Sequence, residues 1–355
     1  MNARKRILAW LALLLMAAIV LATRIAEPFD LALLDRQYAF LRSHAGANAG
    51  HEVVIVGIDQ QTTEQLREPL ALWHAHIGRF VRAMGDAGAS VVGLDIVLPD
   101  RSYEKLLPGL DRALLVDLVA ARQRVPVVLG LTADPEGRPR TIYPAFLAAA
   151  AASGFVLFPT DRDGVVRRFD EHIEVGGETA PTLAGQMARA LGASVGTGLI
   201  NYAAGEKIRY VPLQQVLAWQ AAGDRDALKA AFGGKPVLLG SVLRFEDRLA
   251  VPINPGAWDA EPANAAGVAV HAQALRNLLD ARTAAVCIVA KSWDYQVTEA
   301  LQTTLDEGVA MIADSVRFLH GEGRRVLVDL EHFFDGYKRN PEFSLRAIEA
   351  AVVNG

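Results

Sequence analysis

The sequence predicts an α/β protein: a three-layer domain with a mostly parallel sheet, preceded by a transmembrane helix and followed by two further βα units. Three observations support this prediction. Short apolar, β-branched runs alternate with helical patterns along most of the chain, as in a parallel sheet covered on both faces. An uncharged apolar run lies near the N-terminus. A change of composition near residue 284 sets the last two units apart.

The N-terminal segment has the features of a membrane span. Residues 7–23 carry no charge and follow Arg4, Lys5 and Arg6. The run exceeds the usual signal-peptide core of about 7–15 residues, although a cleaved signal peptide is the alternative. Positive flanks stay on the cytoplasmic side. We therefore expect residues 1–24 to be a basic stub and a helix in the lipid bilayer of the inner (plasma) membrane, with the bulk of the chain periplasmic or extracellular.

Residues 25–282 form one domain of alternating helices and strands in this prediction. The strands are continuous apolar runs, which are typical of strands buried on both faces. They are expected within 52–59, 89–100, 125–132 and 234–252. Helices are expected at 29–42, 72–88, 109–124 and 182–192, and residues 267–280 are expected to begin as a strand or turn that runs into a helix. The first helix is amphipathic by its spacing, with apolar Phe29, Leu33, Leu34, Phe40 and Leu41. Residues 154–170 predict a hairpin-like insertion with its turn at Asp163–Gly164.

Composition excludes several classes of protein. The chain is 52% hydrophobic and 21% charged, which indicates a globular fold, and its net charge of −4 gives no reason to expect a nucleic-acid partner. A single cysteine, Cys287, excludes a disulfide framework and a cysteine-based zinc site. Nucleotide-binding glycine loops, a serine-hydrolase elbow and a His-Glu-x-x-His motif are absent from the sequence. We therefore expect no metal site, no cofactor and no assembled catalytic set in the domain.

Four polar residues are candidates for ligand binding. Asp59 and Asp95 lie at the ends of predicted strands, and open α/β sheets bind ligands beyond the carboxyl ends of their strands. The two acids bind a cation or a polar ligand, or they cap helices and brace loops. Arg167 either receives an anionic ligand or pairs with the acids of the preceding turn. Asp247 lies in the polar loop after the strand that begins near residue 234.

Two apparent metal motifs have simpler explanations. His74 and His76 are two residues apart on a predicted helix and therefore face nearly opposite sides, which predicts surface or capping histidines. Asp161, Asp163 and Gly164 lack the twelve-residue calcium pattern with its terminal Glu, which predicts a tight turn.

An ordered set of segments resembles a known family. The segments are FDLALLDRQYAFLR, VVIVGID, W-x-x-x-I-x-R, GASVVGLDIVLPD, DRDGVVRR, INYAA, VLLGSVLRFEDRLAVP and GVAVHAQALRNLLD. Together they resemble the type-two CHASE domain over about residues 25–282, with an atypical loop at Trp73–His76. The resemblance implies an extracellular sensory domain like those attached to bacterial histidine kinases and adenylate cyclases. It also implies an extracellular ligand of unknown identity and a possible homodimer.

The tail resembles a different family. Residues 284–355 hold seven basic and eleven acidic side chains, which account for the whole net charge. Their KSWD, VTEAL, TTL, DSV and EHFFDGYK segments resemble citramalate synthase, a relative of isopropylmalate synthase that condenses acetyl-CoA with a keto acid on a TIM barrel. The resemblance implies that Glu331 is the catalytic acid/base. The family's metal-binding Arg-Asp and His-x-His elements are missing from residues 284–355, and two βα units make an incomplete TIM barrel of eight. We therefore expect no synthase activity.

These observations predict a membrane-anchored, extracytoplasmic sensory protein that lacks its output domain and carries a truncated or chimeric tail. Two alternatives stay open. One is an acyltransferase of the citramalate/isopropylmalate synthase family whose missing parts come from another chain. The other is a structural module in which the α/β domain serves only as an assembly surface.

Overall fold

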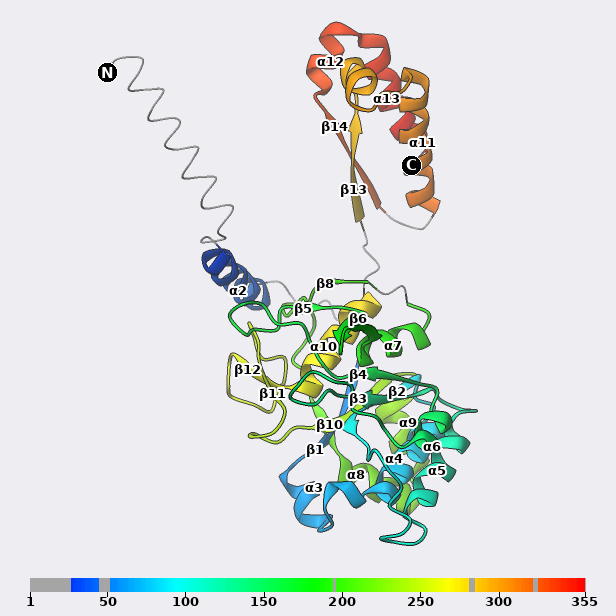
Figure 1. Cartoon of the computed structure of the whole chain (residues 1–355). Helices are drawn as coiled ribbons and strands as arrows, with labels where there is room; N and C mark the ends of the chain where they lie inside the picture. The colour runs from blue at the N-terminus through cyan, green and yellow to red at the C-terminus, as the bar shows by residue number, and fades with distance from the viewer. Residues whose placement is uncertain (1–26, 45–51, 194–195, 281–284, 322–324, 355) are drawn as a thin grey trace, which may run out of the picture. The chain divides into compact units, whose positions relative to one another are not determined.

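The computed structural model describes residues 27–44, 52–193, 196–280, 285–321 and 325–354. The chain divides into two compact units, residues 1–280 and 281–355 (Figure 1). Within the described ranges, no helix is both long enough and apolar enough to cross a membrane. The span expected at residues 7–23 lies outside the described residues.

Six parallel strands form the central sheet of the first unit, in the order β4-β3-β2-β10-β1-β9. They are β1 (Val54–Ile58), β2 (Val91–Val97), β3 (Val127–Leu131), β4 (Ala152–Phe155), β9 (Tyr210–Pro212) and β10 (Pro236–Ser241). The predicted parallel sheet is therefore confirmed. Strand β10, from late in the sequence, lies between β1 and β2.

Helices cover both faces of this sheet (Figure 1). One core joins it to α4 (His74–Ala87), α5 (Leu110–Ala121), α8 (Leu213–Ala222) and α9 (Arg225–Phe232). The other joins it to α7 (Leu183–Ala190) and α10 (Gly267–Asp280). Side chains of β1 alternate between the cores: Val54 and Val56 face the first and Ile55 the second. Three-layer packing thus explains why the strands are apolar throughout.

Helix α2 (Glu27–His44) forms where it was expected, but its predicted apolar face does not. Most of its apolar side chains are exposed, namely Phe29, Leu33, Phe40 and Leu41. The one buried residue is Tyr38, whose ring meets Tyr202 edge-on at 6.0 Å between centroids. The amphipathic prediction was wrong because, of the predicted apolar residues, Leu34 packs against the core, and polar and aromatic contacts make the rest of the attachment.

The hairpin predicted within residues 154–170 was also wrong. Its turn forms, with Gly164 N–H donating to Asp161 O at 2.9 Å. However, β4 pairs with β3, and β5 (Arg168–Phe169) pairs with β8 (Gly198–Leu199). The remaining small sheets are a hairpin of β6 (His172–Val175) with β7 (Glu178–Pro181), and β11 (Arg248–Ala250) with β12 (Asn264–Ala266). Two short helices, α3 (Gln60–Gln65) and α6 (Pro144–Ala149), and a 3₁₀ turn at Leu70–Leu72 complete this unit.

The second unit contains one parallel strand pair, β13 (Ala285–Lys291) and β14 (Arg325–Glu331). Its helices are α11 (Leu305–Gly321), α12 (Phe333–Arg339) and α13 (Pro341–Asn354), with a π-helical turn at Gln296–Ala300. The core is small and consists of Ala290, Ile312, Val316, Ala347 and Ala350. Val289 and Leu327 are exposed, which matches the uncovered apolar face expected of an isolated pair of βα units.

Candidate functional site

Asp59 acts as a helix cap. Its Oδ1 accepts hydrogen bonds from the N–H of Thr62 at 2.8 Å and from the Thr62 hydroxyl at 2.7 Å, at the start of α3. Its Oδ2 accepts a hydrogen bond from the Tyr210 hydroxyl at 3.2 Å. Burial and the neighbouring carboxylate raise the pKa of Tyr210, so the phenol keeps its proton and donates. The capping alternative from the sequence is confirmed.

A cavity of about 590 Å³ opens beside this cap, beyond the carboxyl ends of β1 and β10, and is called here the Asp59 cavity. It is lined by Asp59, Gln60, Gln61, Tyr210, Val242, Leu243, Arg244, Phe245 and Glu246. The lining offers carboxylates, a guanidinium, amides and a phenol, together with the 93% exposed ring of Phe245. This mixture suits a small polar ligand that stacks on one aromatic face.

Asp95 lies inside β2 and not at its end, and it is buried. Its Oδ1 is 3.7 Å from Nε2 of His271. Within the described residues its Oδ2 has no hydrogen-bond partner. Burial, with the charge of Asp247 as a second cause, raises the pKa of the Asp95 carboxyl well above its ordinary value. Burial therefore favours the protonated form of this carboxyl.

Asp247 and His271 are the charged or titratable neighbours of Asp95; Asp247 is exposed, whereas His271 is buried. Asp247 has a left-handed backbone (φ 48°), and its carboxylate lies against Gly267 at the start of α10, where a Cβ would overlap it. Partial loss of water around its carboxyl raises the pKa of Asp247, while the charge of Arg248 opposes that shift. Burial lowers the pKa of His271 to about 4, so its imidazole is neutral at pH 7. Its ring packs on Phe158 with centroids 4.3 Å apart.

Two of the expected acids thus come together, and the third does not. Asp95 interacts with the charge of Asp247, whereas Asp59 lies beyond the intervening strand β10. In the described part of the chain, no group of three or more His, Cys, Asp or Glu side chains is arranged to hold a metal ion. Sequence reasoning missed His271. One sequence signal was available: His271 is a single polar, titratable residue inside the otherwise apolar run GVAVHAQAL. In the structure this run belongs to α10, which packs on the sheet.

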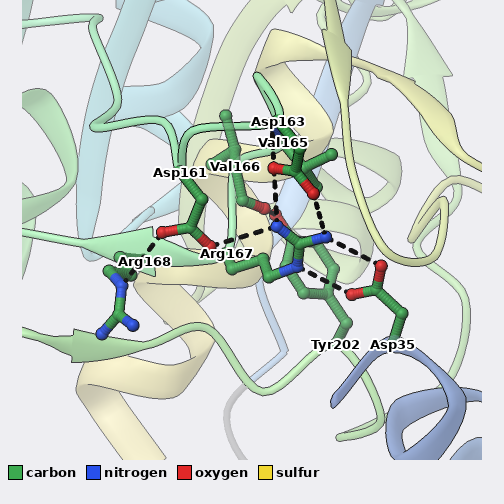
Figure 2. Close-up of polar contacts among 8 residues, drawn as sticks. All are labelled: Asp35, Asp161, Asp163, Val165, Val166, Arg167, Arg168 and Tyr202. Atoms are coloured by element: carbon green, nitrogen blue, oxygen red, sulfur yellow. Dashed lines mark hydrogen bonds and ion pairs between the residues drawn. The ribbon is translucent and has the colours of Figure 1, made fainter. Parts of the chain in front are cut away.

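Arg167 is the centre of an ion cluster, shown in Figure 2. Its side chain is 1% exposed. All five of its N–H donors are used. Two bonds go to Asp35 at 2.7 and 2.8 Å, two to Asp163 at 2.9 and 2.8 Å, and one to Asp161 at 3.1 Å. The pairing alternative is confirmed, and the guanidinium has no donor left for an anionic ligand.

This cluster attaches α2 to the body of the domain. Asp35 belongs to α2, and Asp161 and Asp163 belong to the turn that precedes Arg167. Tyr202 lies beneath the cluster and donates its hydroxyl to Val166 O at 2.8 Å. The backbone carbonyl of Tyr202 accepts a hydrogen bond from the side chain of Arg42 in α2. The pKa of Arg167 is raised, first by its bonds to Asp35, so the cluster stays charged. Helix α2 is therefore held by directional polar bonds at two points.

The two histidines of α4 have different environments. His74 is 2% exposed, contrary to the expected surface or capping role. Its Nε2 is 3.6 Å from Oδ1 of Asp111, and its ring packs against Phe146 with centroids 5.4 Å apart. Burial lowers the pKa of His74, while Asp111 opposes the shift. His76 is partly exposed, with its Nε2 3.9 Å from Glu68.

Glu331 lies at the end of β14, directly opposite Lys291 at the end of β13. The two side chains form an ion pair, and the bond from Lys291 lowers the pKa of the Glu331 carboxyl. Ser292 holds the same strand end by donating its hydroxyl to Glu331 O at 2.9 Å. The ion pair favours a carboxylate that accepts protons only weakly. A catalytic role for Glu331 stays a prediction.

Comparison with known proteins gives two separate similarities. A family model described as a CHASE2 domain matches residues 10–306. The (R)-citramalate synthase of Aquifex aeolicus (strain VF5) is 48% identical over 81 residues, and that of Streptomyces coelicolor is 49% identical over 81 residues. Each alignment covers 23% of this chain and 15% of the relative, so the chain spans about 15% of the length of these curated relatives. No solved structure matches the chain significantly. Both resemblances read from the sequence are confirmed.

Proposed function

Since the chain belongs to the CHASE2 domain family, we propose that it is a sensory protein whose first unit binds a small polar ligand in the Asp59 cavity, on the extracytoplasmic side of a membrane. The observation that carries the proposal is the family match over residues 10–306. The position of the cavity, beyond the carboxyl ends of two adjacent parallel strands, supports it because open α/β sheets hold their ligands there.

The proposed anchor is the uncharged run at residues 7–23, with Arg4–Arg6 on the cytoplasmic side. The extracellular character of the family supports this orientation. The test is digestion of a C-terminal epitope by protease added to intact spheroplasts, compared with lysed cells. The proposal expects digestion in both samples. An epitope protected in spheroplasts and lost on lysis would refute the orientation.

Ligand binding is tested by thermal unfolding of the purified protein in a library of small polar metabolites. A compound present at 100 times its dissociation constant stabilises the folded state by about 2.7 kcal/mol. We expect a smaller stabilisation in Phe245→Ala, which removes the aromatic wall of the cavity, and an unchanged one in Phe334→Ala. Both rings are highly exposed, at 93% and 77%, so neither truncation disturbs a core. Should no compound stabilise the protein, the assembly-surface alternative would replace this proposal.

Identity to the synthases favours a second candidate activity for the second unit, condensation of an acyl-CoA with a keto acid. We propose that this unit is inactive alone, because two βα units leave its sheet open and one face uncovered. The assay mixes purified protein, acetyl-CoA and pyruvate with Mg²⁺ or Mn²⁺ and follows release of free CoA. Turnover above that of the Glu331→Gln variant would overturn the proposal.

A further inference from the structure

Another cavity, called here the His74 cavity, opens beyond the carboxyl end of β2 and has a volume of about 340 Å³. One side is formed by the 3₁₀ turn at Leu70–Leu72 and the first turn of α4, and the other by residues 96–101, Tyr103 and Arg140. None of these lining residues belongs to the Asp59 cavity, although both cavities open at the carboxyl edge of one parallel sheet. This edge therefore offers two separate places where a ligand can bind.

His74 is a buried polar side chain in the wall of this cavity that lacks a hydrogen-bond partner. Its ring is 2% exposed, and within the described residues neither ring nitrogen is hydrogen-bonded. The nearest carboxylate, Asp111, is 3.6 Å from Nε2, which is beyond hydrogen-bond range. Asp111 already accepts hydrogen bonds from the Ser102 hydroxyl at 2.5 Å and the Tyr103 N–H at 3.1 Å. The imidazole therefore has a donor to offer to an occupant of the cavity.

The polar part of the cavity favours a single negative charge. His74 is the first residue of α4, and Trp73 before it provides no side-chain cap, so the partial positive charge of the helix N-terminus is uncompensated there. Of the charged side chains in the wall, Asp100 and Arg101 pair with each other at 3.1 Å. Among the described residues, no hydrogen bond or ion pair involves the guanidinium of Arg140. One cation is thus left for one anionic group.

The remaining wall is apolar. Ile77, Ile96 and Leu98 are buried and form its inner part. Leu70 and Val97 are 48% and 39% exposed, so an occupant of the cavity would cover apolar surface that now meets water. Removal of such surface from water favours binding. An occupant that suits both parts of the cavity has an apolar body and one anionic group.

We propose that the His74 cavity binds a small monocarboxylic acid with an apolar body, whose carboxylate accepts a hydrogen bond from His74 and pairs with Arg140. The guanidinium of arginine matches a carboxylate through two parallel N–H···O bonds. The apolar body of the acid lies against Ile96 and Leu98. This site is additional to the Asp59 cavity, and it selects its ligand by a different chemistry.

The test is isothermal titration of the full chain with two acids, phenylacetate and 4-methylpentanoate. Binding of either acid supports the proposal. Phenylacetamide keeps the shape of phenylacetate without the charge, and acetate keeps the charge without the body. Each should bind at least about tenfold more weakly than the matching acid, because each lacks one of the two recognised parts. Lack of binding by both acids would overturn the proposal, as would equal affinity for phenylacetate and phenylacetamide.

Variants separate a site contact from a general effect of charge. Arg140→Gln removes the proposed ion pair and should weaken binding of the acid about tenfold. Arg112→Gln, at an exposed position of α5 outside the cavity, changes the net charge equally and should leave the affinity unchanged. Equal weakening by the two variants would contradict a specific site. Phe245→Ala in the Asp59 cavity should bind the acid normally, so the outcome does not depend on the ligand proposed there.

Nuclear magnetic resonance of the imidazole nitrogens tests the role of His74 without a substitution in the core. The nitrogen signals of His74 should shift when phenylacetate binds, whereas those of His76, which does not line the cavity, should stay nearly unchanged. His74→Phe keeps a ring against Phe146 and removes both nitrogens, so it should weaken binding about tenfold. Unchanged His74 signals in the complex would refute the proposed hydrogen bond even if this variant fails to fold.

Discussion

Replacement of Arg167 by Met tests how strongly the ion cluster of Figure 2 holds the domain together. The change keeps much of the aliphatic stem and removes a 1% exposed guanidinium with five bonds to three carboxylates. Loss of one partner from a buried ion pair costs about 3–5 kcal/mol, because the remaining charge stays unpaired. Asp35 and Asp163 are 32% and 42% exposed and keep some hydration, so we expect a loss of about 3 kcal/mol.

Arg168 provides a matched control for this variant. It is the next residue, carries the same charge and is 54% exposed, with one bond to Asp161 at 3.2 Å. Arg168→Met should cost no more than about 1 kcal/mol. Arg167→Lys, with three donors in place of five, should fall between the two. Urea unfolding followed by circular dichroism gives the free energies. Equal losses in Arg167→Met and Arg168→Met would refute the reasoning.

Three further predictions follow from the same kind of reasoning. The folded pKa of His271 is lowered from 6.5 to about 4, so its stabilising contribution is complete above pH 6.5 and is lost as the pH falls towards 4. The loss should reach about 3 kcal/mol, measured as the difference in unfolding free energy between wild type and His271→Gln across that range. Asp59→Ala should lower the free energy of unfolding in urea by about 1 kcal/mol. Asp59→Asn, which keeps a capping oxygen, should lower it clearly less. Gly154→Ala would place a Cβ 2.5 Å from backbone atoms of Thr182 and should cost about 1–3 kcal/mol in thermal unfolding. Gly196→Ala, with open space around it, is the control, and equal losses would contradict the steric argument.

The sheet could be predicted from the sequence because few other folds can accommodate strands with this apolar pattern. Runs such as Val54–Ile58 and Val91–Val97 are apolar on both faces, which only a doubly covered sheet accommodates. Helix α4 ends at Gly88 as predicted, because Gly88 adopts a left-handed conformation (φ 73°) that glycine permits. Local patterns were sufficient for these elements.

The candidate sites were harder to predict because they depend on partners that are distant in sequence. A turn signal at Asp163–Gly164 cannot specify that the following strand pairs with residues 198–199. Likewise, Asp95 and His271 are far apart in the chain and meet only through the packing of α10 on the sheet. The six polar residues of α3 carry no apolar periodicity, and their helix depends on the cap from Asp59.

The position of β10 has a consequence for the order of events during synthesis. Strands β1 and β2 do not pair with each other, because β10 lies between them and pairs Val237 with both Val54 and Val92. The sheet therefore cannot close until a strand near residue 240 has emerged. Such long-range pairing makes folding slow, since a large chain loop must close before the contacts form. A nascent chain exposes the edges of β1 and β2 that β10 later covers throughout that interval, and such exposed strand edges favour aggregation.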